Sequence, residues 1–428
     1  MSGVAREHSD VGKARIAAMD NTSGYSVPNS PCFDESPNHK AGDSADSLGA
    51  YRNTLMDAFG TPQRVLTHGS GVFVWDEQGR RYCDLLAGIA VNALGYAHSA
   101  IVQTVSEQAQ RLMHTSNYFA TPAQIQVAHA LQETLTAEGY DGARARIFLC
   151  NSGTEANEAA LKMAMLHKAG GNIVALEGSF HGRTLGSLSV TYKPQIRQPF
   201  APLLSNVRFA APQVEALSAL CDDSTAAIIL EPIQGEAGVY PLDPQLLTCA
   251  RRLADAHNAL LIVDEVQTGM GRTGRWYAHS DVVQADIITL AKGLGGGFPI
   301  GAAIGIGRAA QLITPGMHGS TFGGNPLAAA VAQTVISEIR PLLRRVADNG
   351  TWLMQELSLR GFPVRGAGLL IGIDVPDAPS YQRALLERGF IVNAANATTL
   401  RLAPPLTITR EELMPFLDTL LEVSHICS

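Results

Sequence analysis

The chain has 428 residues, more than one small core needs, and this length suits two or three domains. Hydrophobic residues make up 46% of the sequence and charged residues 17%, so a large interior can be buried. The net charge is −7, with 32 basic and 39 acidic residues and no long basic run, which argues against nucleic acid or a membrane surface as a partner.

Residues 1–47 differ in composition from the rest of the chain. They are rich in Ser, Asn, Asp, Gly and Pro and have neither a helical nor a strand period, so we expect a disordered extension. The segment lacks the apolar stretch of a secretory signal and is too acidic for an organellar transit peptide. The six cysteines form no close pair, which predicts reduced thiols and no metal site. We therefore expect a cytoplasmic protein.

From about Tyr51 onward the pattern is that of a folded α/β protein. Two strand-like runs, 71–76 and 81–85, predict a hairpin. Apolar runs without alternation follow, separated by helical patterns such as 154–168 and 245–257. This succession predicts a mostly parallel sheet with helices on both faces. The expected strands of this sheet are 146–150, 172–176, 226–230, 259–263, 286–290 and 300–306.

A long helical pattern from 326 to about 346 comes next, and a smaller α+β segment follows it to the C-terminus. In an open parallel sheet the binding site lies at the carboxyl ends of the strands. The polar residues that directly follow each apolar run are therefore the candidates for chemistry.

Small residues open the helix after the first of these strands, in the sequence Asn151-Ser-Gly-Thr154. Free backbone N–H groups at a helix start can hold a phosphate, and the helix dipole favours its negative charge. An ordinary helix cap by Ser152 or Thr154 is the other interpretation. The motif alone leaves both open.

Two further apolar runs end in charged side chains. Asp264 follows the run 259–263 and could pair with a cationic ring nitrogen or a metal, or cap the next loop. A nucleotide hydrolase would also need a G-x-x-x-x-G-K-S/T loop, which the sequence lacks. Lys292 follows the run 286–290, where burial would lower its pKa and make it nucleophilic. The alternative is a lysine that reaches to solvent.

One ligand could touch the phosphate cradle, the carboxylate and the lysine together. Pyridoxal phosphate has the matching groups, since it carries a phosphate, a basic ring nitrogen and an aldehyde. The combination therefore predicts a pyridoxal-phosphate enzyme in which Lys292 carries the cofactor as a Schiff base.

Gly269-Met-Gly-Arg-Thr-Gly274 has the spacing of a dinucleotide-binding loop. It begins six residues after Val263, and it leads into the polar and aromatic segment 275–279 instead of an apolar helix. An NAD-dependent dehydrogenase is therefore a remote alternative. A non-catalytic binding protein that keeps the same fold is another.

Six motifs occur in order along the chain: Asn151-Ser-Gly-Thr-Glu-Ala-Asn157, Phe180-His-Gly-Arg183, Glu231-Pro-Ile-Gln-Gly-Glu236, Asp264-Glu-Val-Gln267, Lys292 and Gly319-Ser-Thr-Phe-Gly-Gly-Asn-Pro326. Together they resemble the class III (subgroup II) aminotransferases, and the likeness extends from about Tyr51 to the C-terminus. Within that class, the segment 88–95 is most similar to the acetylornithine aminotransferases of arginine biosynthesis. The segment 96–99 departs from the Gly-His-x-His-Pro sequence that is usual in this class.

The resemblance implies the fold type I architecture of pyridoxal-phosphate-dependent transferases. This is a large, mostly parallel seven-stranded domain with a small α+β domain built from both chain ends. The expected boundaries are 48–100 for the N-terminal part of the small domain, 101–345 for the large cofactor-binding domain and 346–428 for the C-terminal part. A homodimer with shared active sites is also implied.

The resemblance further implies roles for the cofactor-binding residues. Phe180 would stack on the ring face, Asp264 would pair with the ring nitrogen, and Gln267 would lie near the ring oxygen. Thr321 of the partner subunit would reach the phosphate. The full implied set is Ser152, Gly153, Thr154, Phe180, Asp264, Glu265, Val266, Gln267, Lys292 and Thr321.

Four residues would handle the substrates. By resemblance, Arg183 holds the α-carboxylate of acetylornithine, Arg401 holds that of glutamate, and Ser320 lies near the substrate. Strand alternation turns Arg401 away from its apolar neighbours. Glu236 would pair with Arg401 and mask it from the wrong substrate. A surface salt bridge is the alternative interpretation of either arginine.

The implied reaction converts N2-acetylornithine and 2-oxoglutarate into N-acetylglutamate 5-semialdehyde and glutamate by a ping-pong mechanism. Lys292, Asp264 and Glu236 are the expected catalytic residues, with Lys292 as general acid and base. The alternative is a related class III enzyme for ornithine, succinylornithine, succinyl-diaminopimelate or 4-aminobutyrate. The apolar Ile89 argues against free ornithine, because enzymes for that substrate have a tyrosine nearby.

Overall fold

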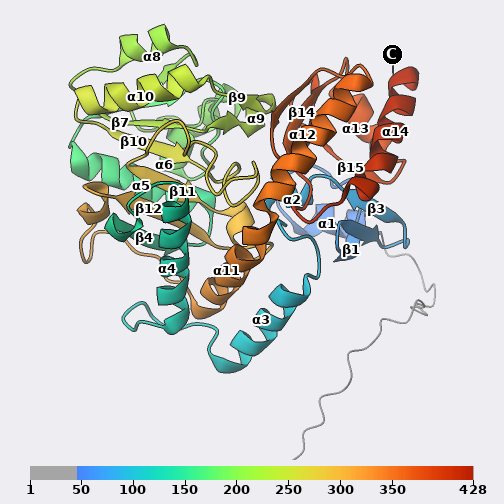
Figure 1. Ribbon diagram of the computed structural model, residues 1–428, viewed down its shortest axis with the longest axis horizontal. Coiled ribbons are helices and arrows are strands. Elements are labelled where there is room, and N and C mark those ends of the chain that lie inside the picture. Colours follow the sequence, from blue (N-terminus) through green and yellow to red (C-terminus); the bar gives the residue numbers. More distant parts are fainter. Residues whose placement is uncertain (1–45, 428) are drawn as a thin grey trace, which may run out of the picture. The chain divides into compact units, whose positions relative to one another are not determined.

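Seven strands form the central sheet of the computed structural model (Figure 1). In spatial order they are β4 (Ala145–Cys150), β12 (Gly301–Ile306), β11 (Ile287–Leu290), β10 (Leu260–Asp264), β7 (Thr225–Leu230), β5 (Asn172–Leu176) and β6 (Val207–Ala210). Only β12 runs antiparallel to its neighbours. The predicted mostly parallel seven-stranded sheet is confirmed, although the sequence patterns did not predict β6.

Side chains of these strands alternate between two hydrophobic cores. In β7, Ile228 and Leu230 belong to one core, and Ala227 and Ile229 belong to the other. Helix α5 (Gly153–His167) covers the second face with its buried alanines, and α10 (Pro244–Ala256) packs on the first. Burial on both faces explains why the strand sequences show no polar alternation.

The structure describes residues 46–427, so the expected disordered extension lies almost entirely outside the described residues. At its end, Asp46 caps helix α1 (Ser47–Thr54) by accepting a hydrogen bond from Gly49 N. The described residues up to Gln63 and those from Arg64 onward form two compact units.

Two four-stranded sheets accompany the central sheet within the second unit. The first contains β1 (Leu66–Ser70), β2 (Phe73–Asp76), β3 (Arg81–Asp84) and β15 (Phe390–Ile391). Strands β2 and β3 form the predicted hairpin, and β15 pairs with β3, which joins segments from the two ends of the chain in one small domain. The second contains β13 (Val364–Ala367), β14 (Leu370–Asp374), β17 (Thr399–Leu402) and β16 (Asn393–Ala394). A short hairpin joins β8 (Ile233–Gln234) and β9 (Tyr240–Pro241).

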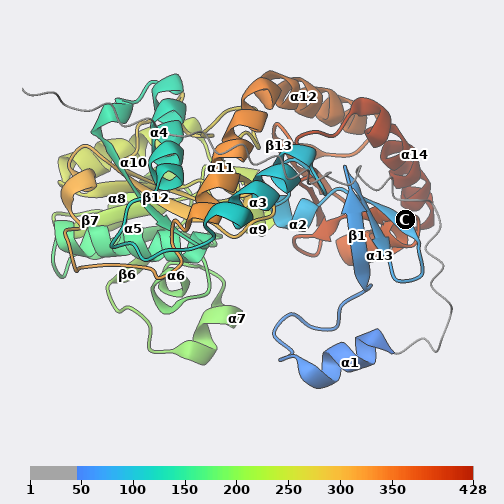
Figure 2. The same ribbon diagram turned by 90° about the horizontal axis from the view of Figure 1, so that it is seen from below.

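The helix after the central sheet is broken where the sequence predicts one helix over 326–346. Helix α11 (Pro326–Ile339) ends in the 3-10 turn η5 (Arg340–Leu342), and α12 (Leu343–Leu359) follows. Pro341 lies in the turn, where a proline lacks the N–H that a continuous helix would use. Figures 1 and 2 both show α11 at the centre of the molecule and α12 in the C-terminal part.

The remaining helices range from single turns to the 17 residues of α14. The α-helices are α2 (Ala87–Ala90), α3 (Ser99–Arg111), α4 (Pro122–Ala137), α6 (Leu185–Ser189), α7 (Pro194–Arg197), α8 (Val214–Leu220), α9 (Gly235–Gly238), α13 (Ala378–Leu386) and α14 (Arg410–Ile426). The 3-10 turns are η1 (Gly142–Arg144), η2 (Gln198–Phe200), η3 (Lys292–Leu294) and η4 (Ala309–Gln311).

The segment with dinucleotide-like spacing forms turns and begins no helix. Its Arg272 is buried and donates hydrogen bonds to Leu369 O at 3.1 Å and to Pro404 O at 2.5 Å. Gly274 has a φ of 85° and packs against Ala347. The loop therefore connects the central sheet to the C-terminal part of the chain.

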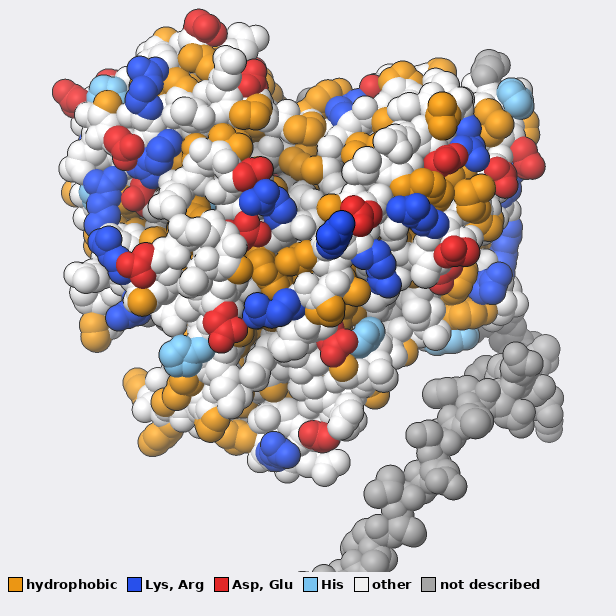
Figure 3. Space-filling model, viewed as in Figure 1, with side chains coloured by type: hydrophobic (Ala, Val, Ile, Leu, Met, Phe, Trp, Pro, Cys, Tyr) orange, Lys and Arg blue, Asp and Glu red, His pale blue; other side chains and the backbone are white. Residues whose placement is uncertain are grey.

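Charged side chains of both signs are interspersed on the face shown in Figure 3, with no extended basic field among its described residues. Within residues 46–427, no helix has the length and apolar composition needed to cross a bilayer. The same range holds no group of three or more His, Cys, Asp or Glu side chains suited to a metal ion.

Candidate active site

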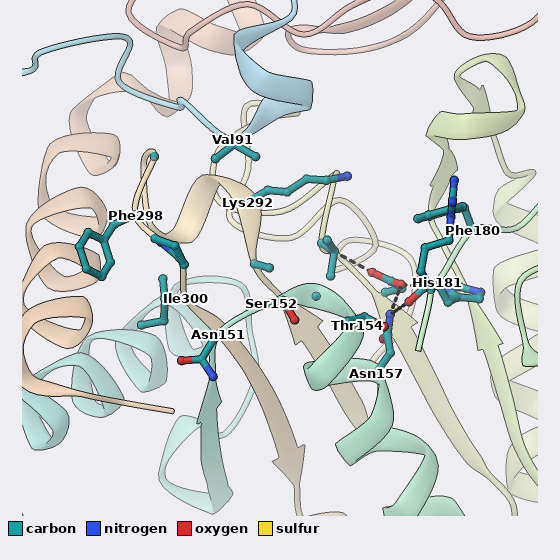
Figure 4. A pocket seen from close by; sticks show the side chains of 18 residues that line it. Val91, Asn151, Ser152, Thr154, Asn157, Phe180, His181, Lys292, Phe298 and Ile300 are labelled. Atoms are coloured by element: carbon teal, nitrogen blue, oxygen red, sulfur yellow. Dashed lines mark hydrogen bonds and ion pairs between the residues drawn. The ribbon is translucent and has the colours of Figure 1, made fainter. Parts of the chain in front are cut away.

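A cavity of about 400 Å³ opens at the carboxyl ends of the central strands (Figure 4). Its walls come from the turn after β4, the segment after β5, the end of β10 and the segment after β11. Most of the residues expected to bind cofactor or substrate line it together. They are Ser152, Gly153, Thr154, Phe180, Arg183, Asp264, Val266 and Lys292.

The first turn of α5 forms one wall of the cavity. Ser152 is its N-cap, with Oγ accepting a hydrogen bond from Glu155 N at 3.3 Å, so the capping interpretation is correct for this residue. The first N–H groups of a helix have no acceptor within it and are available to an anion. Gly153 leaves room for this turn, because an added Cβ would lie 2.7 Å from Val266 Cγ1. The turn can therefore bind a phosphate and be capped by Ser152 at the same time.

Asp264 ends β10, is 4% exposed and has both carboxylate oxygens engaged. Its Oδ1 accepts a hydrogen bond from Val266 N at 2.9 Å, which caps the following loop. Its Oδ2 accepts from Asn157 Nδ2 at 2.8 Å and lies 2.7 Å from His181 Nδ1. These contacts hold the carboxylate in one orientation at the cavity wall.

Lys292 begins η3 and extends toward the side of the cavity where Phe180 and His181 lie (Figure 4). Its φ of 42° lies in the left-handed region, a conformation that is strained for residues with a Cβ and is concentrated at functional sites. Burial lowers the pKa of Lys292, and the opposing effect of the Glu236 charge does not reverse that direction. Such an amine is a better nucleophile and base at neutral pH than an exposed lysine.

Arg401 and Glu236 form an ion pair between Nη1 and Oε1, as the sequence predicts. Arg401 is buried, so a surface salt bridge is the wrong interpretation for it, whereas the Glu236 side chain is 37% exposed. The guanidinium also donates to Gln267 Oε1 at 3.2 Å and to Asn393 Oδ1 at 2.8 Å. Burial acts to raise the pKa of Glu236, but the charge and hydrogen bond of Arg401, together with the Lys292 charge and a hydrogen bond from Gln267, hold that pKa below its usual value. Both charges also act on Lys292, so the pair is close to the reactive amine.

Besides Glu236, Gln267 and Arg401, three further expected site residues are not among those that line this cavity. Ser320 and Thr321 line a second cavity of about 1030 Å³, and Ser320 Oγ accepts a hydrogen bond from Asn151 Nδ2 at 3.0 Å. Glu265 is buried, and its Oε1 accepts from His279 N at 3.1 Å and lies 2.6 Å from His279 Nδ1. The Glu265 side chain therefore has buried contacts with His279, and its expected cofactor contact stays a prediction.

A family model described as aminotransferase class III matches residues 57–423 of the chain. The chain belongs to the class III aminotransferases. A curated acetylornithine aminotransferase of Mycolicibacterium smegmatis is 46% identical over 380 residues, which cover 86% of this chain and 96% of the relative. The acetylornithine aminotransferase of Bifidobacterium longum is 43% identical over 413 residues, covering 88% and 95%.

Solved structures of aminotransferases share this fold. The N-acetylornithine aminotransferase of Stenotrophomonas maltophilia K279a has a TM-score of 0.75 and 34% identity, covering 89% of this chain and 99% of its own. The ornithine aminotransferase of Toxoplasma gondii ME49 has a TM-score of 0.83 and 32% identity, covering 89% and 95%. The predicted fold type I architecture is thereby confirmed.

Family membership confirms a transaminase with pyridoxal phosphate as its cofactor. The cavity walls fit that molecule group by group, with N–H donors at the start of α5 for the phosphate and the Asp264 carboxylate for the ring nitrogen. The Lys292 amine suits the carbonyl carbon, and the Phe180 ring suits the flat face of the cofactor. The dehydrogenase and the non-catalytic binding protein are therefore set aside.

Three buried residues of this site received no role from the sequence. Asn157 and His181 orient Asp264, and Glu231 Oε1 accepts a hydrogen bond from Phe180 N at 2.9 Å. All three lie inside the motifs that carry the family resemblance. Their presence there is the one signal that could have identified them, because their partners are distant in the sequence.

The buried carboxyl group of Glu231 should make the stability of the fold depend on pH. Burial raises its pKa to about 7 from an ordinary value near 4.5. A raised pKa means that the neutral carboxyl stabilises the fold fully below about pH 4.5, and this contribution is lost as the pH rises through about 7. Glu231→Gln is neutral at every pH and can still accept from Phe180 N. Its melting temperature, measured without cofactor, should therefore rise relative to the wild type between pH 5 and 8.

The largest expected difference is roughly 3 kcal/mol in the free energy of unfolding, taking 1.36 kcal/mol for each pKa unit. Glu422→Gln removes an exposed carboxylate from α14 and serves as the control, with no such trend expected. A constant difference between Glu231→Gln and the wild type across this pH range would show that Glu231 is ionised throughout it.

Proposed function

We propose that the chain transfers the δ-amino group of N2-acetylornithine to 2-oxoglutarate, as a cytoplasmic enzyme of arginine biosynthesis. The Arg401–Glu236 ion pair beside Lys292 is the observation that carries this proposal. A single site must accept glutamate, which has a carboxylate next to its amine, and an ω-amine whose carboxylate is distant. An arginine that can be masked or unmasked meets both needs. Relatives named acetylornithine aminotransferase at 43–46% identity support this substrate over other ω-amines.

The residues of the cavity have distinct roles in this reaction. Bound pyridoxal phosphate supplies a carbonyl carbon that takes the amino group and a cationic ring that absorbs an electron pair. Asp264 keeps a proton on the ring nitrogen, because its carboxylate is held in place by its three donors. Lys292, as the neutral amine, removes the proton from the amino-bearing carbon of the substrate.

The substrate carboxylates require separate arginines. Arg183 lines the outer part of the cavity with its guanidinium carbon 5.7 Å from the centre of the Phe180 ring, and we assign to it the distant α-carboxylate of acetylornithine. Arg401 would bind the α-carboxylate of glutamate after Glu236 moves away. A half-buried Glu236 between two small residues, Gly235 and Ala237, is suited to such a movement.

Glu236→Ala and Arg401→Ala should affect the two half-reactions differently. Loss of Glu236 unmasks Arg401, so the glutamate half-reaction should become about tenfold faster relative to the acetylornithine half-reaction. Loss of Arg401 should slow glutamate and 2-oxoglutarate by about a hundredfold, because a charge-assisted carboxylate contact is removed. Single-turnover absorbance of each half-reaction measures this ratio, and an equal fall of both rates in Arg401→Ala would mean that Arg401 is structural.

A substrate panel tests the proposed function directly. With 2-oxoglutarate as acceptor, kcat/KM should be highest for N2-acetylornithine among acetylornithine, succinylornithine, ornithine, succinyl-diaminopimelate and 4-aminobutyrate. A higher kcat/KM for any other donor would replace the proposed substrate while leaving the aminotransferase class unchanged.

We also propose a homodimer with shared active sites. Thr321 is exposed in the second cavity, near Tyr118, which is 95% exposed, and Phe322, which is 62% exposed. Exposed aromatic side chains gathered around one hollow are typical of a surface that another protein covers. Thr321 lines this second cavity and is not among the residues that line the cavity of Lys292, which supports a second chain bringing it to the phosphate.

Mixing two inactive variants tests the shared site. In a heterodimer of Lys292→Ala and Thr321→Val, one site carries both changes and the other carries neither. Differently tagged chains purified as heterodimers should recover about half of the wild-type activity, because the one unaltered site combines Lys292 of one chain with Thr321 of the other. Mixed homodimers of each variant are the control. Heterodimers no more active than the better parent would place Thr321 outside the partner's site.

A further inference from the structure

Helix α9, the four-residue turn that carries Glu236, is packed on the sheet that carries Arg401. In that sheet, Arg365 of β13 is paired with Gly372 of β14, and Gly372 is paired with Arg401 of β17. Directly paired residues share one face of an antiparallel sheet, so the two arginines lie on the same face with Gly372 between them.

The turn lies directly over Gly372. A Cβ added to Gly372 would lie 2.9 Å from Gly238 O and 3.1 Å from Val239 Cβ, so only glycine lets the turn approach this closely. Arg401 holds the turn on one side through the Glu236 carboxylate. On the other side Arg365 Nε donates a hydrogen bond to Gly238 O at 2.9 Å. The turn that carries the masking carboxylate is thus held between two arginines.

Arg365 is itself fixed on all sides. Its Nη1 donates to Asp374 Oδ2 at 2.6 Å and its Nη2 donates to Thr399 Oγ1 at 2.8 Å. Its guanidinium carbon lies 3.9 Å from the centre of the Tyr240 ring, just beyond the turn. Every polar contact is made by a planar fork of donors in a fixed geometry, which a lysine could not reproduce.

A second contact holds the same turn one residue earlier. Asn396 Nδ2 donates a hydrogen bond to Ala237 O at 2.8 Å, and its Oδ1 accepts one from Thr398 N at 2.9 Å. The last carbonyls of a helix accept no hydrogen bond from an N–H of the same helix, so side-chain donors commonly bind them. Here both donors come from the part of the chain that also contains Arg401.

We propose that Arg365 is a positioning residue that keeps Glu236 paired with Arg401 and thereby helps to set the choice between an ω-amine and glutamate. The inference rests on the proposed function, because it concerns the same masked arginine. Because Arg365 and Asn396 fix the backbone of α9, only the side chain of Glu236 moves when Glu236 separates from Arg401. Without the Gly238 contact, Glu236 leaves Arg401 more often, and Arg401 is more available to a carboxylate.

The test compares Arg365→Gln, Asn396→Ala and Glu236→Ala in the cofactor-loaded enzyme. Arg365→Gln should raise the ratio of the glutamate to the acetylornithine half-reaction by about fivefold, less than the full value of a hydrogen bond from a charged donor, because Arg365 acts on Glu236 only through the backbone of α9. Calorimetric titration with glutarate, which needs no turnover, should show tighter binding by a similar factor. Asn396→Ala should shift both quantities in the same direction, and it tests the proposal should Arg365→Gln fail to fold.

Two controls separate positioning from general damage. Arg360→Gln removes an arginine of similar exposure whose ion pairs are with Glu356 and Asp418, away from α9, and should leave the ratio unchanged. In the double variant Arg365→Gln, Glu236→Ala, the ratio should equal that of Glu236→Ala alone, because Arg365 acts through Glu236.

Equal slowing of both half-reactions in Arg365→Gln, with unchanged glutarate affinity, would show a purely structural role and overturn the inference. A further shift in the double variant would overturn it as well, because Arg365 would then act independently of Glu236. If Glu236→Ala shifts the ratio and Arg365→Gln does not, the proposed function stands and only the role of Arg365 is wrong. If neither variant shifts it, the masking of Arg401 and the role of Arg365 fail together.

Discussion

Lys292→Ala should abolish turnover, with a fall in kcat of at least about 10⁴-fold, equivalent to about 5 kcal/mol of transition-state stabilisation. The reason lies in the surroundings of the amine. Burial lowers the pKa of Lys292, so more of it is the neutral base that can remove a proton from carbon than in an exposed lysine. The cavity and the contacts of Asp264 do not depend on this side chain, so the variant should still bind pyridoxal phosphate, although more weakly.

Two matched variants show whether the amine acts as a base or only as a charge. Lys292→Arg keeps the positive charge but cannot lose a proton at accessible pH, so it should be as inactive as Lys292→Ala. Lys193→Ala removes an exposed lysine at the start of α7 and should keep full activity. Added methylamine, a diffusible base, should restore part of the activity of Lys292→Ala and none of Lys292→Arg.

The covalent link provides an independent measurement. The wild-type protein should be yellow, and reduction with borohydride should attach the cofactor to the peptide that contains Lys292. Attachment to another lysine would disprove the assignment, whatever the activities of the variants.

The sequence predicted the central sheet well because its strands are buried on both faces. Runs such as 172–176 and 226–230 are continuous apolar segments of strand length, and the observed β5 and β7 match them closely. Strand β6 was not predicted, because it lies at the edge of the sheet and its four residues are mostly half-buried. The break at Pro341 was also missed, since apolar spacing continues across the turn and conceals the missing hydrogen bond.

In the site, the sequence identified the reactive residues at the ends of the strands but not the residues that hold them in place. Asp264 and Lys292 stand at the ends of apolar runs, so the sequence alone is enough to recognise their position. Asn157 and His181 reach Asp264 from other segments, and no local spacing records such contacts. Arg365 was missed for the same reason, because its partners Gly238 and Asp374 are brought to it only by the folded sheet.

Asp264→Asn should lower turnover by on the order of a thousandfold, which corresponds to about 4 kcal/mol. The substitution keeps the size of the side chain and removes the charge that would hold a proton on the ring nitrogen. In the wild type both carboxylate oxygens face N–H donors, Val266 N at Oδ1 and the side chains of Asn157 and His181 at Oδ2. The amide NH₂ that Asp264→Asn introduces must replace one of these oxygens, so it faces another donor and loses a hydrogen bond.

Asn157→Ala separates these two effects, because it removes one hydrogen bond to Asp264 and leaves the carboxylate charge in place. We expect about a tenfold loss of kcat for this variant, the size of one buried hydrogen bond.

Single-turnover rates with acetylornithine and with glutamate should fall by the same factor in Asp264→Asn, since the ring nitrogen serves both half-reactions. That common factor distinguishes Asp264 from Glu236 and Arg401, which should affect the two substrates unequally. Turnover of Asp264→Asn within tenfold of the wild type would reduce Asp264 to a cap of the loop at Val266, leaving the ring nitrogen without a partner in this cavity.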